Sequence, residues 1–348
     1  MKLAIDYRYA GKSGIGTYIE GVVEELICTY PQHEFLIIQQ HSNTIDIDFH
    51  NVKKVAVDIK PFSPKELFCF PVSAINQCDA FLTPYINIPG GIKVPVYSTI
   101  HDVLFFDVNG LTSHIGKTIR KAFYNRAINL SKIIFTVSQF SKNRILHHFP
   151  TNKDIEVVYN GVPKEFEMYL PKQLQKQDYF IYVGNIKRHK GLSTLVEAFG
   201  KAQLRGLKSK LIIVGNYENF RTSDNKLIGL IDKNKNIEFT GWVTNERLVS
   251  LVADAKALVQ PSLYEGFGIP PLEAICLGTD VLLSDIPVFK ELYHELSDCF
   301  FRVEDSEDLA NRLLNYIPNP KLNEYRSIFL EKYSYKKTAE KILKAIEE

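Results

Sequence analysis

Short apolar runs alternate with longer amphipathic stretches along most of the chain. In the amphipathic stretches apolar residues recur every three or four positions, as on one face of a helix, whereas the short runs have the length and composition of buried strands. The runs predict strands at 2–6, 35–38, 55–57, 80–82, 96–100, 133–137, 179–183, 210–214, 236–239, 257–259 and 300–303. Strands separated by helix-length segments predict parallel sheets with helices on both faces, which is an α/β fold.

The chain has 348 residues, which is enough for two domains of ordinary size. A polar stretch with Pro171, residues 166–178, has the composition of a linker. We therefore expect a first domain over 1–165 and a second domain over 179–334. The helical patterns are clearest at 17–29, 114–132, 246–255, 272–277, 305–316 and 333–348.

The densest candidate chemistry lies between Leu263 and Asp280, in the stretch LYEGFGIPPLEAICLGTD. Glu265 and Glu273 stand eight positions apart, and the glycines and two prolines between them predict a loop that enters a helix, with Gly278 as its end. Bare amides at a helix start suit a phosphate, and two carboxylates accept hydrogen bonds from two sugar rings. The stretch therefore predicts a nucleotide-sugar site. The alternative is that Glu265 caps the helix and Glu273 lies on its solvated face.

The pattern Glu-x7-Glu within EGFGIPPLEA resembles the donor-site signature of the retaining family-four glycosyltransferases. These enzymes have the GT-B architecture, in which two Rossmann-like domains face each other across a central cleft. Residues 285–288, with Glu291, resemble a segment of the mannosyl- and rhamnosyltransferase branch. The resemblance covers most of the chain and is densest from Tyr182 to Glu291. It implies that the final helix, 335–348, returns to the first domain.

The resemblance assigns donor-site roles to residues of the second domain. Lys190 matches the phosphate-binding lysine, whereas Asn185 stands where many relatives have a second phosphate-binding arginine, a role that Arg188 could take over. Glu265 would hold the transferred sugar and Glu273 the ribose, while the helix start stabilises the leaving diphosphate. The further donor-binding candidates are Gly184, Trp242, Val243, Gly266, Phe267, Gly268 and Ile269. Trp242 would line the base pocket, or it is part of the core.

Two features of the first domain have a functional and a structural interpretation. Gly14 and Gly16 are predicted in a loop after the first strand, which is either a tight turn or, by resemblance, lies across from the donor phosphates. His101 ends the strand 96–100 and by resemblance lies beside the transferred sugar; otherwise it is structural. The apolar loop 103–106 would contact a lipid-like acceptor or pack inward.

The helix predicted over 114–132 has both basic and apolar residues. Its cations would contact anionic lipid headgroups, or it is an ordinary amphipathic helix whose apolar side lies in the core.

Composition limits the classes of function. The net charge of +2 argues against nucleic-acid binding by overall field. Five cysteines without a metal-binding spacing favour a reducing cytoplasm, and the absence of a signal peptide or an apolar run of bilayer length leaves only peripheral membrane contact. We expect no metal and no cofactor. The acidic pair in 46–48 is interpreted as part of an edge strand rather than as a metal site.

The resemblance, together with these residues, implies metal-independent, retaining transfer of a hexose or deoxyhexose, with mannosyl or rhamnosyl favoured, in surface polysaccharide assembly. The donor would be GDP-mannose, dTDP-rhamnose or a UDP-sugar, and the acceptor a glycan or a lipid-linked glycan. Closure of the two domains would exclude water. One rival interpretation is a phosphorylase or epimerase of the same architecture. Another is a non-catalytic nucleotide-sugar-binding scaffold subunit, which the departure at Asn185 keeps open.

Overall fold

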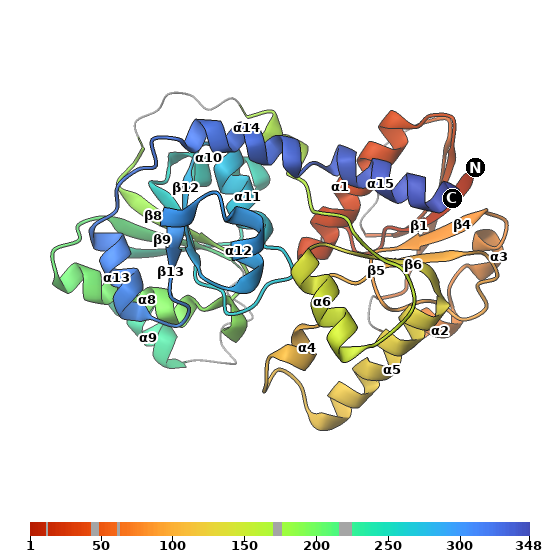
Figure 1. The fold of residues 1–348 in the computed structure, drawn as a ribbon, viewed down its shortest axis with the longest axis horizontal. Helices are drawn as coiled ribbons and strands as arrows, with labels where there is room; N and C mark the ends of the chain where they lie inside the picture. The colour runs from red at the N-terminus through yellow and green to blue at the C-terminus, as the bar shows by residue number, and fades with distance from the viewer. Residues whose placement is uncertain (12, 43–48, 61–62, 170–175, 216–224) are drawn as a thin grey trace. The chain divides into compact units, whose positions relative to one another are not determined.

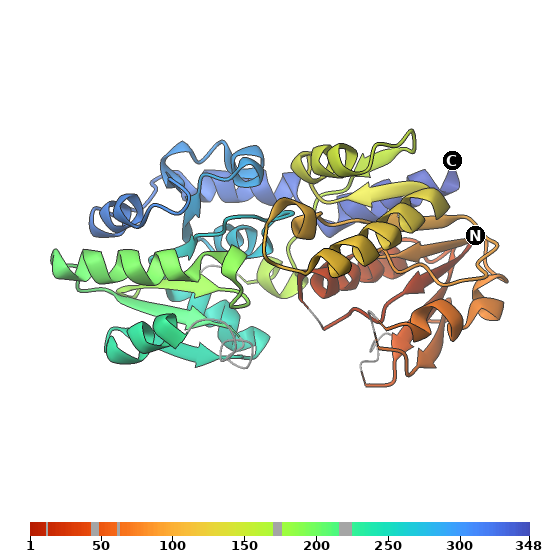
Figure 2. The same ribbon diagram turned by 90° about the horizontal axis from the view of Figure 1, so that it is seen from below.

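The computed structural model describes residues 1–348 except 12, 43–48, 61–62, 170–175 and 216–224. The described chain divides into two compact units: Met1–Gly161 together with Tyr333–Glu348, and Val162–Lys332. Each unit is a parallel sheet with helices packed on it (Figures 1 and 2). The predicted α/β class, with two Rossmann-like halves, is confirmed.

The described part of the first unit has a sheet of seven parallel strands in the order β3-β2-β1-β4-β5-β6-β7. Its strands are β1 (Lys2–Asp6), β2 (Glu34–Gln40), β3 (Val52–Val57), β4 (Ala80–Thr83), β5 (Val96–Thr99), β6 (Ser131–Thr136) and β7 (Ile155–Val157). The central strands are apolar and buried because both faces of a doubly wound sheet are covered. The strand order reverses between β1 and β4, and open α/β sheets bind ligands at the carboxyl ends of strands beside such a switch point.

Helices of the first unit include a C-terminal one that packs against the first. The helices are α1 (Ser13–Thr29), α2 (Lys65–Phe68), α3 (Val72–Ile75), α4 (Leu104–Asp107), α5 (His114–Leu130), α6 (Gln139–His148) and α15 (Tyr335–Glu347). Helices α1 and α15 lie side by side (Figure 1). A Cβ atom at Gly21 would stand 2.2 Å from the ring of Tyr335, so a glycine permits this close approach. In the described segments no helix is both long and apolar enough to cross a bilayer.

The described part of the second unit has six parallel strands in the order β10-β9-β8-β11-β12-β13. They are β8 (Tyr179–Val183), β9 (Lys210–Val214), β10 (Ile237–Gly241), β11 (Ala257–Gln260), β12 (Asp280–Ser284) and β13 (Phe300–Phe301). The helices are α7 (Lys164–Glu167), α8 (Leu192–Leu204), α9 (Asn225–Lys233), α10 (Asn245–Asp254), α11 (Ile269–Cys276), α12 (Pro287–Tyr293), α13 (Ser306–Leu314) and α14 (Leu322–Lys332), with 3-10 turns η1 (Arg188–Lys190) and η2 (Ser297–Cys299). The switch point of this sheet lies between β8 and β11.

Two predictions about the first unit are wrong. The glycine segment 14–16 is not a loop, because α1 already begins at Ser13. Gly16 serves a close backbone approach instead, since a Cβ there would lie 2.7 Å from the Tyr9 carbonyl oxygen. The apolar segment 103–106 is also not a loop. It turns into α4, whose Phe106 side chain is buried in the core of the unit together with Val103.

Other predicted elements differ in extent. Strands β1, β8 and β9 have the predicted bounds, whereas β13 is two residues long rather than four. Helix α14 was not predicted. The stretch predicted as a linker, 166–178, begins inside α7, and its residues 170–175 lie outside the described residues, as do the acidic residues of 46–48.

Candidate active site

Two loops meet at the switch point of the second sheet. One follows β8 and carries η1, and the other follows β11. The amide of Leu263 donates to the carbonyl of His189 over 2.8 Å. Gly191 has a φ of +67°, and a Cβ there would stand 1.9 Å from the carbonyl oxygen of Pro261. Because only glycine allows this backbone contact, the two loops are fixed to each other and the residues beside Gly191 face those after β11.

This contact brings Lys190 to Glu265, residues that are 75 positions apart in sequence. The Lys190 Nζ atom lies 2.7 Å from Oε1 and 2.8 Å from Oε2 of Glu265. The Lys190 side chain is 22% exposed and that of Glu265 is 10% exposed. The site therefore combines a partly buried ammonium group and a carboxylate that compensate each other's charge.

Two serines that the sequence interpretation missed support this carboxylate. Ser262 is fully buried, and its hydroxyl donates to Oε1 of Glu265 over 2.7 Å. Its carbonyl in turn accepts a hydrogen bond from Ser284 Oγ at the end of β12, while the Gln260 amide donates to its hydroxyl over 3.0 Å. The available signal was a serine at the carboxyl end of an apolar strand, since Ser262 follows β11 by two residues and Ser284 is the last residue of β12.

The start of α11 is shaped by close packing around Gly268. This residue has a φ of +90°, and a Cβ there would lie 2.6 Å from the ring of Phe289. Its carbonyl accepts a hydrogen bond from Tyr293 Oη over 3.2 Å. The side chains of Phe267 and Ile269 are buried, so these two predicted donor-binding residues can offer a ligand mainly backbone groups. Pro270 in the first turn and Gly278, with a φ of +69°, confirm the predicted helix start and stop.

Glu273 lies one turn into α11 and is only partly exposed. Burial, and secondarily the negative charge of Glu165, raises its pKa from 4.5 to about 8. In the described chain no group donates a hydrogen bond to its carboxylate. Glu273 is therefore a poorly solvated carboxyl group without a hydrogen-bond donor among the described residues, and hydrogen-bond donors of a ligand would be favourable there.

The other side chains of the basic loop after β8 are either buried or exposed to solvent. His189 is buried, its Nδ1 atom has no hydrogen-bond partner in the described residues, and burial with the nearby charge of Lys190 lowers its pKa to about 4. It is therefore neutral at physiological pH. The predicted residues Asn185 and Arg188 are exposed, and the Gly184 amide is bonded to the Val214 carbonyl. Lys190 is thus the cation that this loop places beside Glu265.

Trp242 follows the edge strand β10 and is 78% exposed. The alternative that this side chain belongs to the core is therefore wrong. Val243 beside it is partly buried. Both follow the carboxyl end of a strand, as Lys190 and Glu265 do, so the four residues belong to the same edge of the second sheet.

In the first unit, His101 follows β5 at the carboxyl edge. Its Nε2 atom lies 3.1 Å from the Pro84 carbonyl oxygen, and the ring packs edge-on against Tyr18 with centroids 4.9 Å apart. Burial lowers the pKa of His101 to about 4. The imidazole is therefore neutral. Because Nε2 donates to a carbonyl, Nδ1 is an acceptor. Gly14 is exposed in the first turn of α1, and Gly16 is buried.

A buried ion network at the carboxyl end of β1 was also missed. Arg8 donates to Asp6 over 2.7 Å and to Glu66 over 2.8 Å, and all three side chains are fully buried. Asn87 adds a 2.5 Å hydrogen bond to Glu66, and the guanidinium carbon lies 4.4 Å from the ring centroid of Phe70. The network fixes the chain between β1 and α1. Asp6 ends β1 and Arg8 follows it by two positions, and this spacing does not indicate that Arg8 pairs with Glu66, which is 58 residues away.

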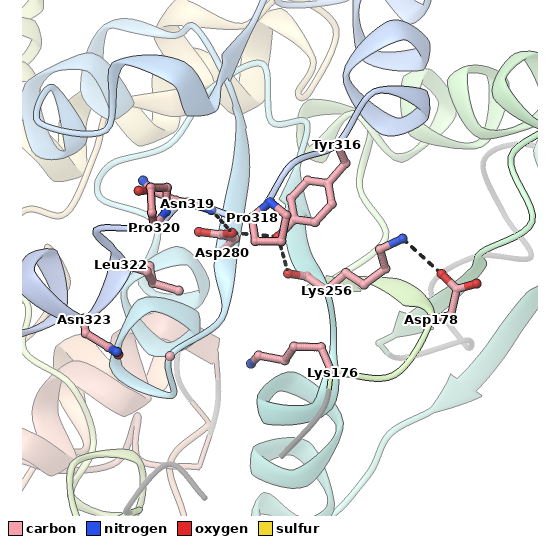
Figure 3. A pocket seen from close by; sticks show the side chains of 11 residues that line it. Lys176, Asp178, Lys256, Asp280, Tyr316, Pro318, Asn319, Pro320, Leu322 and Asn323 are labelled. Carbon is pink, nitrogen blue, oxygen red and sulfur yellow. Dashed lines mark hydrogen bonds and ion pairs between the residues drawn. The ribbon is translucent and has the colours of Figure 1, made fainter. Parts of the chain in front are cut away.

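A cavity of about 550 Å³ lies at the opposite, amino edge of the second sheet (Figure 3). The Tyr316 hydroxyl lies 2.6 Å from Asp280 and 2.8 Å from the Lys256 carbonyl oxygen, and its one proton is shared between these acceptors. The Asn319 amide donates to Asp280 over 2.8 Å, and Lys256 pairs with Asp178 at 3.0 Å. These polar groups bond to one another and connect the segment after α13 to the amino ends of β11 and β12. The cavity is therefore remote from the candidate site, and its polar network has a structural explanation. Among the described residues no group of acids, histidines or cysteines could hold a metal ion.

Two family models match the chain in succession. The model described as "Glycosyltransferase Family 4" matches residues 75–166, and the model described as "Glycosyl transferases group 1" matches residues 170–336. The second match includes Lys190, Glu265 and Glu273. Together the two matches cover parts of both units.

The chain is similar to two O-antigen chain mannosyltransferases. RfbU of Salmonella typhimurium strain LT2 is 29% identical over 63% of this chain and 64% of its own length. O-antigen chain mannosyltransferase B of Escherichia coli is 27% identical over 60% of this chain and 58% of its own length. The aligned region thus spans less than two thirds of either relative.

Solved structures share the fold at low sequence identity. Sucrose-phosphate synthase from Thermosynechococcus elongatus superposes with a TM-score of 0.77 at 16% identity, covering 99% of this chain and 98% of that one. HepE of Anabaena, solved in complex with UDP and glucose, superposes with a TM-score of 0.73 at 16% identity, covering 100% and 99%. These similarities confirm the GT-B fold.

Proposed function

The chain belongs to the glycosyltransferases of group 1 and family 4, and we propose that it transfers a hexosyl or deoxyhexosyl residue from a nucleoside-diphosphate sugar with retention of configuration. Similarity to two O-antigen mannosyltransferases favours a mannosyl donor such as GDP-mannose, with rhamnosyl transfer second, and a glycan or lipid-linked acceptor in polysaccharide assembly. The observation that carries the proposal is the Lys190–Glu265 pair at the switch point, beside the start of α11.

The donor diphosphate would take the place of Glu265 as the partner of Lys190. In the structure both oxygens of Glu265 accept from the ammonium group of Lys190. A diphosphate carries more negative charge than one carboxylate, so it competes for Lys190 and frees Glu265 to accept hydrogen bonds from sugar hydroxyls. The amides of 266–269 at the start of α11 add donors to the leaving group. Glu273, one turn later, would accept from the ribose, and Trp242 with Val243 would contact the base.

His101 is proposed to act on the transferred sugar as a hydrogen-bond acceptor. The support is its tautomer: Nε2 is engaged with the Pro84 carbonyl, and the low pKa keeps the ring neutral, which leaves Nδ1 as a lone-pair acceptor. A neutral imidazole orients a hydroxyl group without adding positive charge beside the oxocarbenium-like centre. Replacement of His101 by alanine is therefore expected to reduce kcat more than it weakens donor binding.

We further propose that Lys190 and the α11 amides stabilise the departing diphosphate in place of a metal cation. Lys190→Ala is expected to reduce kcat by about 100-fold or more, in line with the loss of a principal charge contact in the transition state. Lys187→Ala is the matched control, because it removes the same charge from an exposed position of the same loop. Full activity is expected in excess EDTA. If EDTA abolishes the activity and an added divalent cation restores it, the metal-independent mechanism is refuted.

A peripheral membrane contact through α5 is proposed for delivery of a lipid-linked acceptor. Ile115 and Ile119 are one turn apart on this helix and are 74% and 54% exposed, and the helix contains basic residues but no aspartate or glutamate. Exposed apolar side chains on a basic helix suit an anionic bilayer surface. Cosedimentation with phosphatidylglycerol vesicles should fall on Ile115→Asn together with Ile119→Asn, and should be weak with phosphatidylcholine alone.

Thermal unfolding with a panel of nucleotides and nucleotide-sugars tests the donor assignment. A ligand at 100 times its Kd stabilises the protein by about 2.7 kcal/mol, and the gain should vanish in Lys190→Ala but persist in Lys187→Ala. Donor binding without transfer to any acceptor would favour a scaffold subunit instead. Sugar release that requires phosphate, or epimer formation without an acceptor, would favour the phosphorylase or epimerase.

A further inference from the structure

Arg120 on α5 has no hydrogen-bond or ion-pair partner among the residues that the structure describes. Its guanidinium carbon lies 3.7 Å from the ring centroid of Phe105 on α4. Within the described residues no carboxylate pairs with it, and none of its N–H groups donates to a protein atom. Arg126 on the same helix is different, because it donates to the carbonyls of Ile88 and Pro89 over 2.7 and 3.3 Å. Arg126 thus has a structural role, while Arg120 is held in place by stacking and keeps its donors available.

A second cation lies one helical turn before Arg120. The Nζ atom of Lys117 is 3.4 Å from the Phe106 carbonyl oxygen and 5.7 Å from the centroid of the Phe106 ring. In the described chain it too has no carboxylate partner. Residues three apart on a helix are neighbours on one side, and both cations contact α4. Helix α5 contains no aspartate or glutamate, so its own sequence supplies no counter-charge.

These cations lie near the carboxyl edge of the first sheet. Helix α4 follows His101 after two residues, and the Tyr124 hydroxyl of α5 donates to the Asp102 carbonyl over 2.9 Å. The charge of Arg120 also opposes the rise in the pKa of Tyr85, the residue after Pro84, whose carbonyl contacts His101. Arg120 is therefore within electrostatic reach of the edge where His101 stands.

We propose that Arg120 and Lys117 form the binding site for a phosphate or diphosphate group of the acceptor. The proposal rests on the proposed glycosyltransferase function and specifies the class of acceptor: a phosphate or diphosphate ester of an apolar alcohol. Arginine presents a planar fork that matches two phosphate oxygens, and the Phe105 ring orients this fork before the ligand arrives. Lys117 adds a point charge. The partly exposed Phe105 ring beneath Arg120 offers an apolar surface to the other part of such an ester.

Binding of farnesyl diphosphate to the full chain, measured by calorimetry, tests the site. The Lys190→Ala background is used because the donor site also accepts a diphosphate. Arg120→Gln and Lys117→Gln are each expected to weaken binding about tenfold or more. Lys121→Gln, which removes the same charge from the next, exposed position, should change it less than twofold. Arg120→Lys should bind at an intermediate strength because it keeps the charge without the fork.

Phe105→Leu gives a second, independent measurement, since it leaves the charge of Arg120 in place and removes only the stacking ring. It should weaken binding of farnesyl diphosphate by a smaller factor than Arg120→Gln does. An unchanged thermal unfolding profile of each variant excludes loss of folding as the cause. Equal binding by Arg120→Gln and Lys121→Gln would overturn the proposal.

Vesicles distinguish an acceptor phosphate from a lipid headgroup. If Arg120→Gln loses farnesyl diphosphate but still sediments with phosphatidylglycerol vesicles, the site is for the acceptor. If it loses the vesicles and keeps farnesyl diphosphate, the cations are a headgroup contact and the proposal is wrong. Failure of the proposed function would appear elsewhere, as the absence of any nucleotide-dependent stabilisation that requires Lys190, because the donor residues belong to the other unit.

Discussion

Replacing Glu273 by glutamine is expected to stabilise the empty protein while weakening its binding of the donor. The carboxyl group is partly buried on α11, has no hydrogen-bond donor within the described residues, and lies near the negative charge of Glu165. Its ionised form is therefore disfavoured in the folded protein, although it is fully solvated in the unfolded chain. Glutamine has nearly the same shape and no charge, so it removes the penalty without leaving a cavity.

The magnitude follows from the pKa, which burial raises from 4.5 to about 8. The folded protein keeps this proton up to about pH 8, whereas the unfolded chain loses it near pH 4.5, so stability falls as the pH rises between these values. For a completely desolvated group the loss would be about 3 kcal/mol at pH 7 and under about 1 kcal/mol at pH 5. Because water reaches part of the Glu273 side chain, we expect about 1 to 2 kcal/mol at pH 7 to 8.

Thermal unfolding followed by circular dichroism at pH 5 and pH 8 measures the effect. Glu273→Gln should raise the Tm by about 2 to 6 °C at pH 8 and by less than about 2 °C at pH 5, using the usual conversion for a domain of this size. Glu238→Gln, on the exposed side of the edge strand β10, is the control and should show no comparable pH-dependent gain. An equal shift at both pH values, or a loss of stability at pH 8, would refute the reasoning.

The donor measurement completes the test. A nucleotide-sugar that stabilises the wild-type protein should stabilise Glu273→Gln much less, because ribose hydroxyls would lose an anionic acceptor. For the wild type, the apparent donor affinity should rise between pH 7 and pH 8.5 as the carboxylate forms. A more stable variant that also binds the donor as well as the wild type would leave Glu273 without a role in recognition.

Three further predictions concern the supports of the site. Ser262→Ala should reduce kcat about tenfold with little change of KM, because the hydroxyl orients Glu265 over 2.7 Å, and Ser262→Thr should recover most of the loss; equal activity of the two variants would contradict this. Gly191→Ala should destabilise the protein by about 2 to 4 kcal/mol in urea unfolding, whereas Gly200→Ala, in α8 with open space around its Cβ, should not. Arg8→Met leaves two carboxylates buried without a cation and should cost about 3 to 5 kcal/mol, an effect that unfolding at pH 7 would reveal.

Local features of the donor stretch could be predicted because local rules control them. A glycine at a positive φ before the helix, proline in the first turn and glycine after the last turn set the course of the backbone from Gly268 to Gly278. The same rules failed at Gly16. There the residue is glycine because the Tyr9 carbonyl approaches it, not because the chain turns, and α1 simply runs through it. A glycine in sequence does not distinguish a turn from a close contact.

The partners of the site residues could not be predicted, because they depend on strand order. Strands β8 and β11 are separated in sequence by two other strands, yet they are neighbours in the sheet. Their loops touch at Gly191 and Pro261 and at His189 and Leu263, and these contacts bring Lys190 to Glu265. The sequence interpretation assigned the lysine to a phosphate and the glutamate to a sugar, as if each were free. Because Lys190 and Glu265 pair with each other in the structure, a diphosphate that binds Lys190 would replace this contact, and the donor affinity would report the difference in free energy between the two pairings.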